Sequence, residues 1–333
     1  MSSFGENEEQ DLKIFSVFAA MKMTMNFGNA TAAAELFFLG FPGLSGFRFL
    51  LFTLIFSAYI MTVLLDSTIS ILVSTKTSLH SPMYTFLTNF LLSEMCLVTV
   101  IVPNMLRIIW MDGATMSVTG CITQNYFFVS SGTSECYLLT VMSYDRYLAI
   151  CRPLHYNTIM GHNLQYFLII SCWMLGFILG LIPMSLLVML KFCGRNNIDH
   201  YFCDLAPFVT IACSDTSGLE IEIFVLTIPM VAVPFILIVA SYVCIFIVIL
   251  KMPSIGSRQK AFSTCSAHLL VVGIFYGAMF INYFIPVRGH SLALNKILSV
   301  VFTVVTPLFN PIIYSLRNKD MHAVICRYIH WKT

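Results

Sequence analysis

The sequence predicts an all-α membrane protein, a bundle of seven transmembrane helices with the N-terminus outside. The 333-residue chain is 58% hydrophobic and only 10% charged, and its mean hydropathy is +0.85. Typical soluble domains hold about 25% charged residues. Seven apolar stretches each reach the length of about 20 residues that a membrane-spanning helix needs. Short links between these stretches predict one compact bundle rather than separate domains.

Each apolar stretch must be helical, because a bilayer offers no hydrogen bonds to free backbone groups. In chain order, the helices are expected at 47–75, 83–110, 118–144, 165–190, 220–250, 262–287 and 293–315. They form a transmembrane domain at 47–316, between an outer tail at 1–46 and a cytoplasmic tail at 317–333 with a short amphipathic helix. Acidic residues in 1–22 argue against a secretory signal peptide. That segment is either a disordered extension or precedes a working start at Met23 or Met25.

Basic residues in the short loops predict the orientation, since loops rich in Lys and Arg stay in the cytoplasm. With the N-terminus outside, the cytoplasmic segments are strongly basic and the outer segments are net negative. The cytoplasmic basic residues are Lys76, Arg146, Arg152, Lys251, Arg258, Lys260, Arg317, Lys319, Arg327 and Lys332, opposed only by Asp145 and Asp320. A multi-pass protein of the plasma membrane with an extracellular N-terminus is therefore expected.

Four cysteines and one glycosylation sequon fall on the predicted outer side. Cys121 begins the third helix, and Cys193, Cys203 and Cys213 lie in the loop between the fourth and fifth helices. In an oxidising compartment these four are expected to form two disulfides, with three pairings open. The other seven of the 11 cysteines are interpreted as small apolar side chains. Asn29, in Asn-Ala-Thr, is the predicted glycosylation site.

Three acidic residues share one predicted depth in the membrane. At 1.5 Å per residue, Asp66, Glu94 and Glu135 lie about 15 to 18 Å from the cytoplasmic side. Carboxyl groups there must hold protons, bind a cation such as sodium, or face water. Two interpretations stay open, namely protonated structural groups and a cation or proton site. No other cofactor is expected.

Two further features mark the cytoplasmic half. The Asp145-Arg146 pair lies about 37 Å along the third helix from Cys121, at its inner end. It is either an ordinary surface ion pair or a functional one. On the seventh helix, Pro311 after Asn310 removes a backbone donor and predicts a hinge before Tyr314.

Five ordered motifs join these features. They are Leu79-His80-Ser81-Pro82-Met83-Tyr84, Met142 to Cys151, Ser241-Tyr242, Lys260 to Leu269, and Pro307 to Asn318. With them, the chain from about Asn29 to Arg327 resembles the olfactory receptors among the rhodopsin-like G-protein-coupled receptors. The resemblance implies a receptor, not an enzyme, that senses a volatile odorant and activates the stimulatory G protein of olfactory neurons to raise cyclic AMP. Membrane lipid is an expected partner and nucleic acid is not.

The resemblance also implies roles for individual residues. Asp145 would hold Arg146 at rest and release it toward Tyr242, while Tyr314 would swing inward and the cytoplasmic half of helix six, up to His268, would move outward. The implied disulfides are Cys121–Cys203 and Cys193–Cys213.

The stretch His200-Tyr201-Phe202-Cys203-Asp204 resembles a loop proposed to bind metal in this family. A disulfide-bonded Cys203 offers no thiolate, so no metal site is expected and His200 is interpreted as a loop hydrogen-bonder.

Two positions depart from the family pattern. Leu65-Asp66 stands where the first helix usually has Gly-Asn, and the acid of the second helix is Glu94 rather than Asp. Asp66 and Glu94 are therefore expected to share a proton or to bind a cation together.

The ligand cavity that the resemblance implies lies between helices three, five, six and seven. Val304 replaces the Schiff-base lysine of light receptors, and Phe128 replaces the aspartate of amine receptors. The predicted lining is Phe128, Val129, Gly132, Thr133, Leu226, Met230, Tyr276, Met279, Phe280, Tyr283 and Thr303. Aromatic residues at helical spacing also occur in ordinary packing. As a set, these predict an apolar pocket with a few hydroxyls for a small uncharged alcohol, aldehyde, ketone or ester.

A transporter or channel is the alternative class, because acids within a membrane also mark ion pathways. The odd number of helices and the absence of inverted repeats weigh against it. No nucleophile, metal cluster or phosphate-binding loop indicates an enzyme.

Overall fold

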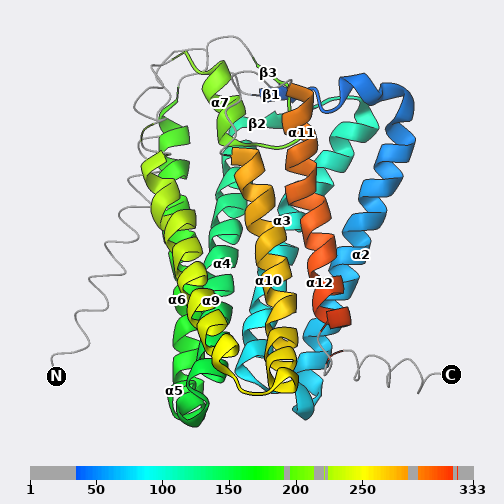
Figure 1. The fold of residues 1–333 in the computed structure, drawn as a ribbon. Coiled ribbons are helices and arrows are strands. Elements are labelled where there is room, and N and C mark those ends of the chain that lie inside the picture. Colours follow the sequence, from blue (N-terminus) through cyan, green and yellow to red (C-terminus); the bar gives the residue numbers. More distant parts are fainter. Residues whose placement is uncertain are drawn as a thin grey trace, which may run out of the picture.

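The protein is a bundle of long helices with a small sheet across one end (Figure 1). The computed structural model describes residues 35–190, 196–213, 221, 224–283, 292–317 and 321. We call the end that carries the strands the sheet end, and the opposite end, where α5 (Tyr156–Ile159) lies, the α5 end. The N-terminal tail up to residue 34, including Asn29, and nearly all of the predicted amphipathic C-terminal helix lie outside the described residues.

The long helices lie close to the predicted ranges. They are α2 (Arg48–Thr75), α3 (Pro82–Met111), α4 (Val118–Cys151), α6 (His162–Met189), α9 (Val233–Lys251), α10 (Ile255–Tyr283), α11 (Leu292–Val300) and α12 (Thr306–Arg317). Two π-helical turns, η4 (Ile228–Ala232) and η5 (Val301–Val305), lead into α9 and join α11 to α12. Short elements complete the described chain: η1 (Pro42–Phe47), η2 (Thr77–Leu79), η3 (Pro153–His155) and α7 (Leu205–Ile211).

Five segments of the described chain are long and apolar enough to cross a membrane. They are Pro42–Thr75, Pro82–Met111, His162–Met189, Phe224–Lys251 and Lys296–Ser315. α10 adds a sixth if its two parts, bent by 44° between Ser263 and Cys265, form one span. The polar helix α4 is not among them. It packs against α3, α6, α9 and α10 inside the bundle, so its polar side chains face protein. A seventh span therefore stays a prediction.

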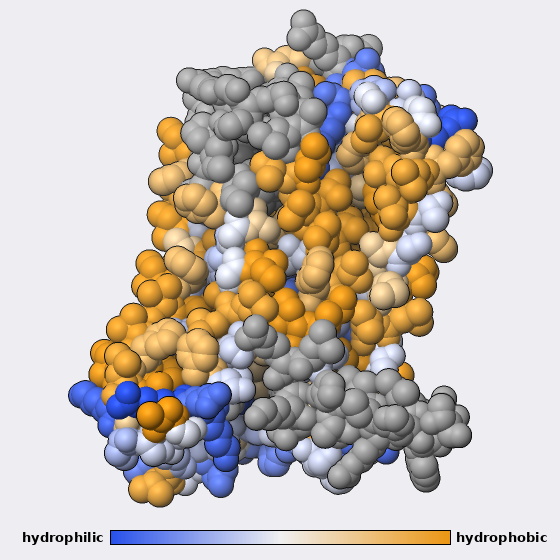
Figure 2. All heavy atoms as spheres, turned by 45° about the vertical axis from the view of Figure 1, so that its right-hand side comes forward, coloured by the Kyte–Doolittle hydropathy of each residue, from blue (hydrophilic) through white to orange (hydrophobic). Residues whose placement is uncertain are grey.

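The outer surface of the bundle is apolar over much of its length (Figure 2). Large hydrophobic side chains such as Leu50 and Leu54 on α2 and Phe167 and Ile170 on α6 are 57–65% exposed. Soluble proteins rarely expose apolar patches of this extent. In the view of Figure 2, hydrophilic side chains gather toward the two ends. This distribution matches a protein whose sides contact lipid.

A close helix contact joins α4 to α6 through small residues. Gly176 and Gly180 on α6 face Ser130 and Ser134 on α4, and a Cβ on Gly176 would lie 2.6 Å from the Ser130 carbonyl oxygen. Small residues four apart let two helix backbones approach and exchange van der Waals contacts in lipid. This contact fixes the face of α4 that turns away from α6, toward the interior.

The sheet is a departure from the all-α prediction. β1 (Glu35–Phe38) pairs antiparallel with β2 (Ala114–Ser117), Leu36 opposite Met116, and parallel with β3 (Asn197–Ile198), Phe38 opposite Ile198. From the sequence, residues 35–46 are expected in the outer tail. In the structure Leu36 and Phe38 are fully buried, so this segment belongs to the folded domain.

Candidate functional site

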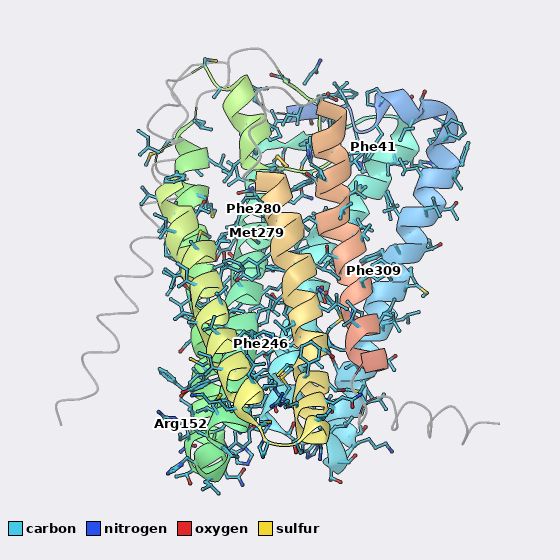
Figure 3. All side chains as sticks on the ribbon, in the orientation of Figure 1. Phe41, Arg152, Phe246, Met279, Phe280 and Phe309 are labelled. Carbon is cyan, nitrogen blue, oxygen red and sulfur yellow. A yellow bond between two sulfur atoms is a disulfide. The ribbon has the colours of Figure 1, made fainter. Side chains whose placement is uncertain are left out.

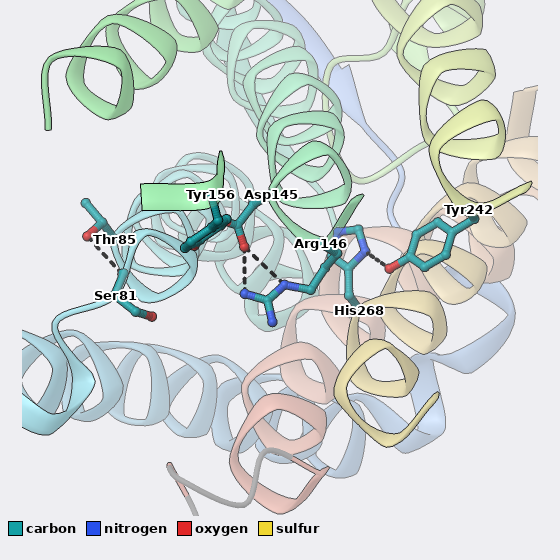
Figure 4. A network of polar contacts seen from close by, with 7 residues as sticks. All are labelled: Ser81, Thr85, Asp145, Arg146, Tyr156, Tyr242 and His268. Atoms are coloured by element: carbon teal, nitrogen blue, oxygen red, sulfur yellow. Dashed lines mark hydrogen bonds and ion pairs between the residues drawn. The ribbon is translucent and has the colours of Figure 1, made fainter. Parts of the chain in front are cut away.

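A buried ion pair lies near the α5 end, on the last turns of α4 (Figure 4). Arg146 Nη2 and Nε donate to Asp145 Oδ2 at 2.6 and 3.1 Å. Tyr156 of α5 donates its hydroxyl to Asp145 Oδ1 at 2.7 Å. Burial and the neighbouring Asp145 charge raise the pKa of Tyr156, so its hydroxyl stays a donor. Asp145 is fully buried, and both of its carboxylate oxygens accept hydrogen bonds, one oxygen from Arg146 and the other from Tyr156. The sequence predicts only the contact with Arg146.

A second polar pair lies beside Arg146. The Tyr242 hydroxyl of α9 and Nδ1 of His268 of α10 are 2.7 Å apart. Arg146 is near enough to interact electrostatically with Tyr242, His268 and the hydroxyl of Tyr314 on α12. Tyr314 Oη is buried without a hydrogen-bond partner in the described chain, and the ring of His268 also interacts with the backbone of Leu139. Five of the predicted switch residues thus meet at one place, namely Asp145, Arg146, Tyr242, His268 and Tyr314, with Arg146 turned to Asp145 and not to Tyr242. Asn310 lies instead beside Glu94, and Pro311 follows it on α12.

The three predicted mid-membrane acids also come together, between α2, α3, α4 and α12. Asp66, Glu94 and Glu135 are each at most 2% exposed, and their carboxyl groups interact electrostatically. Asn310 donates its side-chain amide to Glu94 Oε1. α12 continues through Pro311, whose hinge role stays a prediction.

Toward the sheet end, aromatic rings form a continuous contact path across the interior. Phe128 of α4 lies 6.2 Å from Phe302 of η5, between ring centroids. Phe302 contacts Phe275 of α10 at 5.8 Å, and Phe275 contacts Tyr276 at 5.3 Å. Next to this path, and apart from the neighbouring backbone of α4 itself, no heavy atom of the described residues lies within 4 Å of the position that a Cβ on Gly132 would take. The interior is therefore apolar and aromatic, with space beside Gly132.

Most of the predicted ligand contacts face this interior. Phe128, Thr133, Met230, Tyr276, Met279 and Thr303 are buried, and Val129, Gly132 and Leu226 are half-buried. Phe280 is 59% exposed (Figure 3 labels it on α10), which argues against its predicted ligand contact. The side chain of Tyr283 lies outside the described part. Among the described residues, the buried Tyr276 hydroxyl meets only the thiol of Cys136, a weak hydrogen-bonding group.

Comparisons with known proteins agree with this arrangement. The chain matches the family model described as "Olfactory receptor" over residues 54–332. The chain belongs to the olfactory receptor family. Among its human (Homo sapiens) relatives, Olfactory receptor 6N1 is 43% identical over 92% of this chain and 98% of the relative. Olfactory receptor 11G2 is 41% identical over 96% and 92%, and Olfactory receptor 6B1 is 42% identical over 90% and 96%.

Family membership confirms the resemblance and the expectation that the chain is no enzyme. The chain is an odorant-sensing G-protein-coupled receptor and a multi-pass membrane protein. No observation on the described residues favours the transporter or channel alternative.

The disulfide from α4 to the following loop is as predicted. Cys121 and Cys203 are bonded, with Cα atoms 5.4 Å apart. Cys213 is also disulfide-bonded, while its predicted partner Cys193 lies outside the described residues. Because Cys203 is in a disulfide, it offers no thiolate to a metal. His200 beside it stacks on Tyr201, with centroids 4.7 Å apart, and its Nδ1 accepts a hydrogen bond from the Phe202 amide.

Several residues that close the sheet end of this olfactory receptor are not predicted from the sequence. Tyr201 is fully buried, and its hydroxyl lies 3.1 Å from Thr303 Oγ1. Phe202 packs edge-on against Phe128 at 5.2 Å. Lys296 of α11 is buried and joins two other segments, Gly40 and Asp199. Buried lysines are rare unless paired, but nothing in the sequence around Lys296 shows that it is buried.

His200 predicts a loss of stability in acid. Burial, and then the charge of Lys296, lower the pKa of His200 from 6.5 to about 3. Between pH 6.5 and about pH 3, the unfolded chain binds a proton at His200 and the folded chain does not. The free energy of unfolding therefore decreases as the pH is lowered through that interval. The melting temperature of the purified receptor should drop more between pH 7 and pH 5 than that of His200→Phe, which keeps an aromatic ring. Equal drops would contradict the assignment.

Proposed function

We propose that this olfactory receptor binds a small, uncharged, mostly apolar volatile compound inside the bundle and activates a stimulatory G protein, raising cyclic AMP. The proposal includes a plasma-membrane location, seven spans and an extracellular N-terminus, which makes the sheet end the outer end. The single observation that carries the ligand class is the apolar interior with the buried hydroxyl of Tyr276, whose partner among the described residues is the weakly bonding thiol of Cys136.

The ligand chemistry follows from that lining. The aromatic rings of Phe128, Phe302 and Phe275 offer a large apolar surface, which favours a mostly apolar ligand. A thiol is a weak hydrogen-bonding partner, so a ligand oxygen that accepts from Tyr276 in place of Cys136 gains a stronger hydrogen bond at little desolvation cost. No charged side chain is among the predicted lining. An alcohol, aldehyde, ketone or ester therefore fits better than an acid or an amine.

The contacts that hold Arg146 support the proposal that the α5 end binds the G protein. We call Asp145, Arg146 and Tyr156 together the lock. The Arg146 guanidinium is held by Asp145 within reach of the Tyr242 and His268 pair (Figure 4), so a small rotation exchanges one set of partners for the other. Arg152 lies at the same end (Figure 3). Positive charge at this end agrees with a cytoplasmic location.

The test is a cyclic AMP reporter assay in cells that express the receptor, with volatile compounds of equal chain length that either carry or lack an oxygen. Oxygenated compounds should activate the unmodified receptor. Tyr276→Phe should weaken their potency by about tenfold, the worth of one hydrogen bond, and leave hydrocarbons unaffected. Arg146→Ala should abolish the response at unchanged surface expression.

Two results would contradict the proposal. A response that survives Arg146→Ala, or an odorant-gated current without G protein, would support the channel alternative. Equal potency of Tyr276→Phe and the unmodified receptor for all active compounds would remove the assigned ligand contact.

We further propose that the acid cluster holds a sodium ion or exchanges protons. The residues fit such a group, because several buried oxygens lack hydrogen-bond partners in the described chain. These are both oxygens of Asp66, Glu94 Oε2, Glu135 Oε1 and Asn310 Oδ1. Hard cations prefer oxygen ligands, and the second acid, Asp66, adds negative charge where the family pattern has an amide.

Asp66→Asn should reduce the dependence of odorant potency on sodium or on pH. The amide removes one charge while keeping the size of the side chain, so cation or proton binding should weaken. Dose–response curves in sodium and in N-methylglucamine, at two pH values, measure the effect. Asp112→Asn, at an exposed turn after α3, is the matched control. Unchanged sensitivity to both would refute the site.

A further inference from the structure

A thin lid covers the sheet end of the bundle. We define the lid as residues 35–41, which include β1, and 196–203, which include β3. The two pieces are joined by backbone hydrogen bonds, among them Leu39 N to Ile198 O at 2.9 Å and Gly40 N to His200 O at 3.1 Å. Phe41 stacks on Tyr201 with ring centroids 5.4 Å apart. The lid therefore behaves as one layer rather than as two separate loops.

One edge of the lid is fixed to α4. Cys203 is bonded covalently to Cys121. Its backbone amide donates to Gln124 Oε1 at 3.0 Å, and its carbonyl accepts from Asn125 Nδ2 at 3.1 Å. The disulfide and the two buried hydrogen bonds, all of them made by Cys203, hold this edge more firmly than noncovalent contacts alone would.

The other edge is held to the seventh helix by noncovalent contacts. Lys296 Nζ donates to the Gly40 carbonyl at 2.7 Å and forms an ion pair with Asp199, so one ammonium joins both pieces of the lid. Tyr201 adds its contact with Thr303. Lys296 is 5% exposed, whereas 35% of the Asp199 side chain is exposed, so water can reach the ion pair from one side. Figure 1 shows α11 beside β1 and β3.

The lid forms the roof of the predicted ligand cavity. Phe202 lies edge-on against Phe128, and Tyr201 reaches Thr303. Both partners belong to the predicted ligand lining. A ligand that enters from the sheet end must therefore displace the lid, and the noncovalent edge at Lys296 opens more easily than the disulfide edge.

We propose that Lys296 is a positioning residue that latches the lid against the seventh helix, and that release of this latch is the step that admits and frees the ligand. The evidence for the latch is the contact of Lys296 with Gly40 and Asp199. Its role in ligand passage rests on the proposed function.

Hydrogen–deuterium exchange on the purified full-length receptor tests the latch without any ligand. In Lys296→Met, the amides of Leu39 and Gly40 should exchange faster by about tenfold or more, since a hydrogen bond to a charged group is lost at that edge. Asp199→Asn keeps an acceptor and should show a smaller increase in the same peptides. Arg107→Met, which removes a charge from an exposed site on α3, should show none.

Ligand kinetics test the gate. For an odorant that activates the unmodified receptor, Lys296→Met should raise the association and dissociation rates together, by similar factors, and leave the affinity within about threefold. Loss of a merely structural contact would lower surface expression and affinity without speeding association. Lys296→Arg keeps the charge and should restore most of the slow exchange.

The outcomes separate the two claims. Unchanged amide exchange in Lys296→Met and Asp199→Asn overturns the latch. Faster exchange of the lid with unchanged odorant rates overturns the gate and indicates entry between the helices. If no odorant activates the unmodified receptor, the proposed function fails, and the exchange experiment still decides on the latch. If Lys296→Met does not fold, Asp199→Asn carries the same test.

Discussion

Gly176→Ala is expected to prevent the receptor from folding and reaching the cell surface. The added methyl would lie 2.1 Å from Ser134 Oγ, 2.6 Å from the Ser130 carbonyl oxygen and 3.1 Å from the Ser134 amide nitrogen. Two of these atoms belong to the α4 backbone and cannot rotate away. Overpacking typically costs about 1–3 kcal/mol, and a clash with backbone atoms that cannot move lies at or above the upper end of that range. The total stability of a protein is only about 5–15 kcal/mol.

Gly180 provides a matched case that can be rescued. Its Cβ would meet the Ser130 hydroxyl at 2.3 Å, but the Ser130 Cβ only at 3.4 Å. Gly180→Ala should therefore lower surface expression, and Ser130→Ala should restore it by removing the clashing oxygen. The Ser130 hydroxyl is buried without a hydrogen-bond partner in the described chain, so its loss should cost little. Ser134→Ala should not rescue Gly176→Ala, since the Ser130 carbonyl remains.

Flow cytometry with an N-terminal epitope tag measures surface receptor, and thermal unfolding in detergent measures stability. Gly273→Ala and Gly277→Ala on α10 are the controls, because no heavy atom lies within 4 Å of their added methyl groups. Normal surface levels of Gly176→Ala would show that α4 and α6 can separate at no cost. Such a result would contradict the close contact that orients α4.

Most of the helical architecture was predictable because a lipid environment restricts the choices. An apolar stretch of spanning length can only be a helix there, so predicted ranges such as 83–110 agree with α3 (Pro82–Met111) to within a residue or so. The four-residue strand β1 was not predictable, since it depends on partners in two distant loops. The π-helical turns η4 and η5 likewise have no pattern in the local sequence.

Some residues of the candidate site were likewise predictable from the sequence and others were not. Asp145, Arg146 and the three acids attract attention in the sequence because charge is costly in a membrane, and the structure gathers them as depth counting suggested. Tyr156 and Lys296 carry no such signal, since a tyrosine or lysine near a helix end is ordinary. Phe280 shares its helical spacing with true interior residues and still lies at the surface, because spacing gives a face but not the direction in which it points.

Asp145→Asn is expected to raise signalling in the absence of odorant by about tenfold. The amide cannot form the ion pair that holds Arg146, and hydrogen bonds to charged groups contribute about 1.5–3 kcal/mol. A shift of about 1.4 kcal/mol changes the ratio of two conformations tenfold. The freed guanidinium then has the hydroxyl oxygens of Tyr242 and Tyr314 as nearby acceptors. Cyclic AMP in untreated cells, divided by surface receptor, is the measurement.

Tyr156→Phe tests whether the lock has three members. It removes only the donor to Asp145 Oδ1, 2.7 Å away, so basal signalling should rise less than in Asp145→Asn. Because both changes act through the same carboxylate, the double variant should signal no more than Asp145→Asn alone. Tyr144→Phe is the matched control on α4, since Tyr144 is 38% exposed and stacks on Tyr147. Additive effects of the two changes would mean that Tyr156 acts elsewhere, and a silent Asp145→Asn at normal surface expression would mean that the ion pair does not hold the resting state.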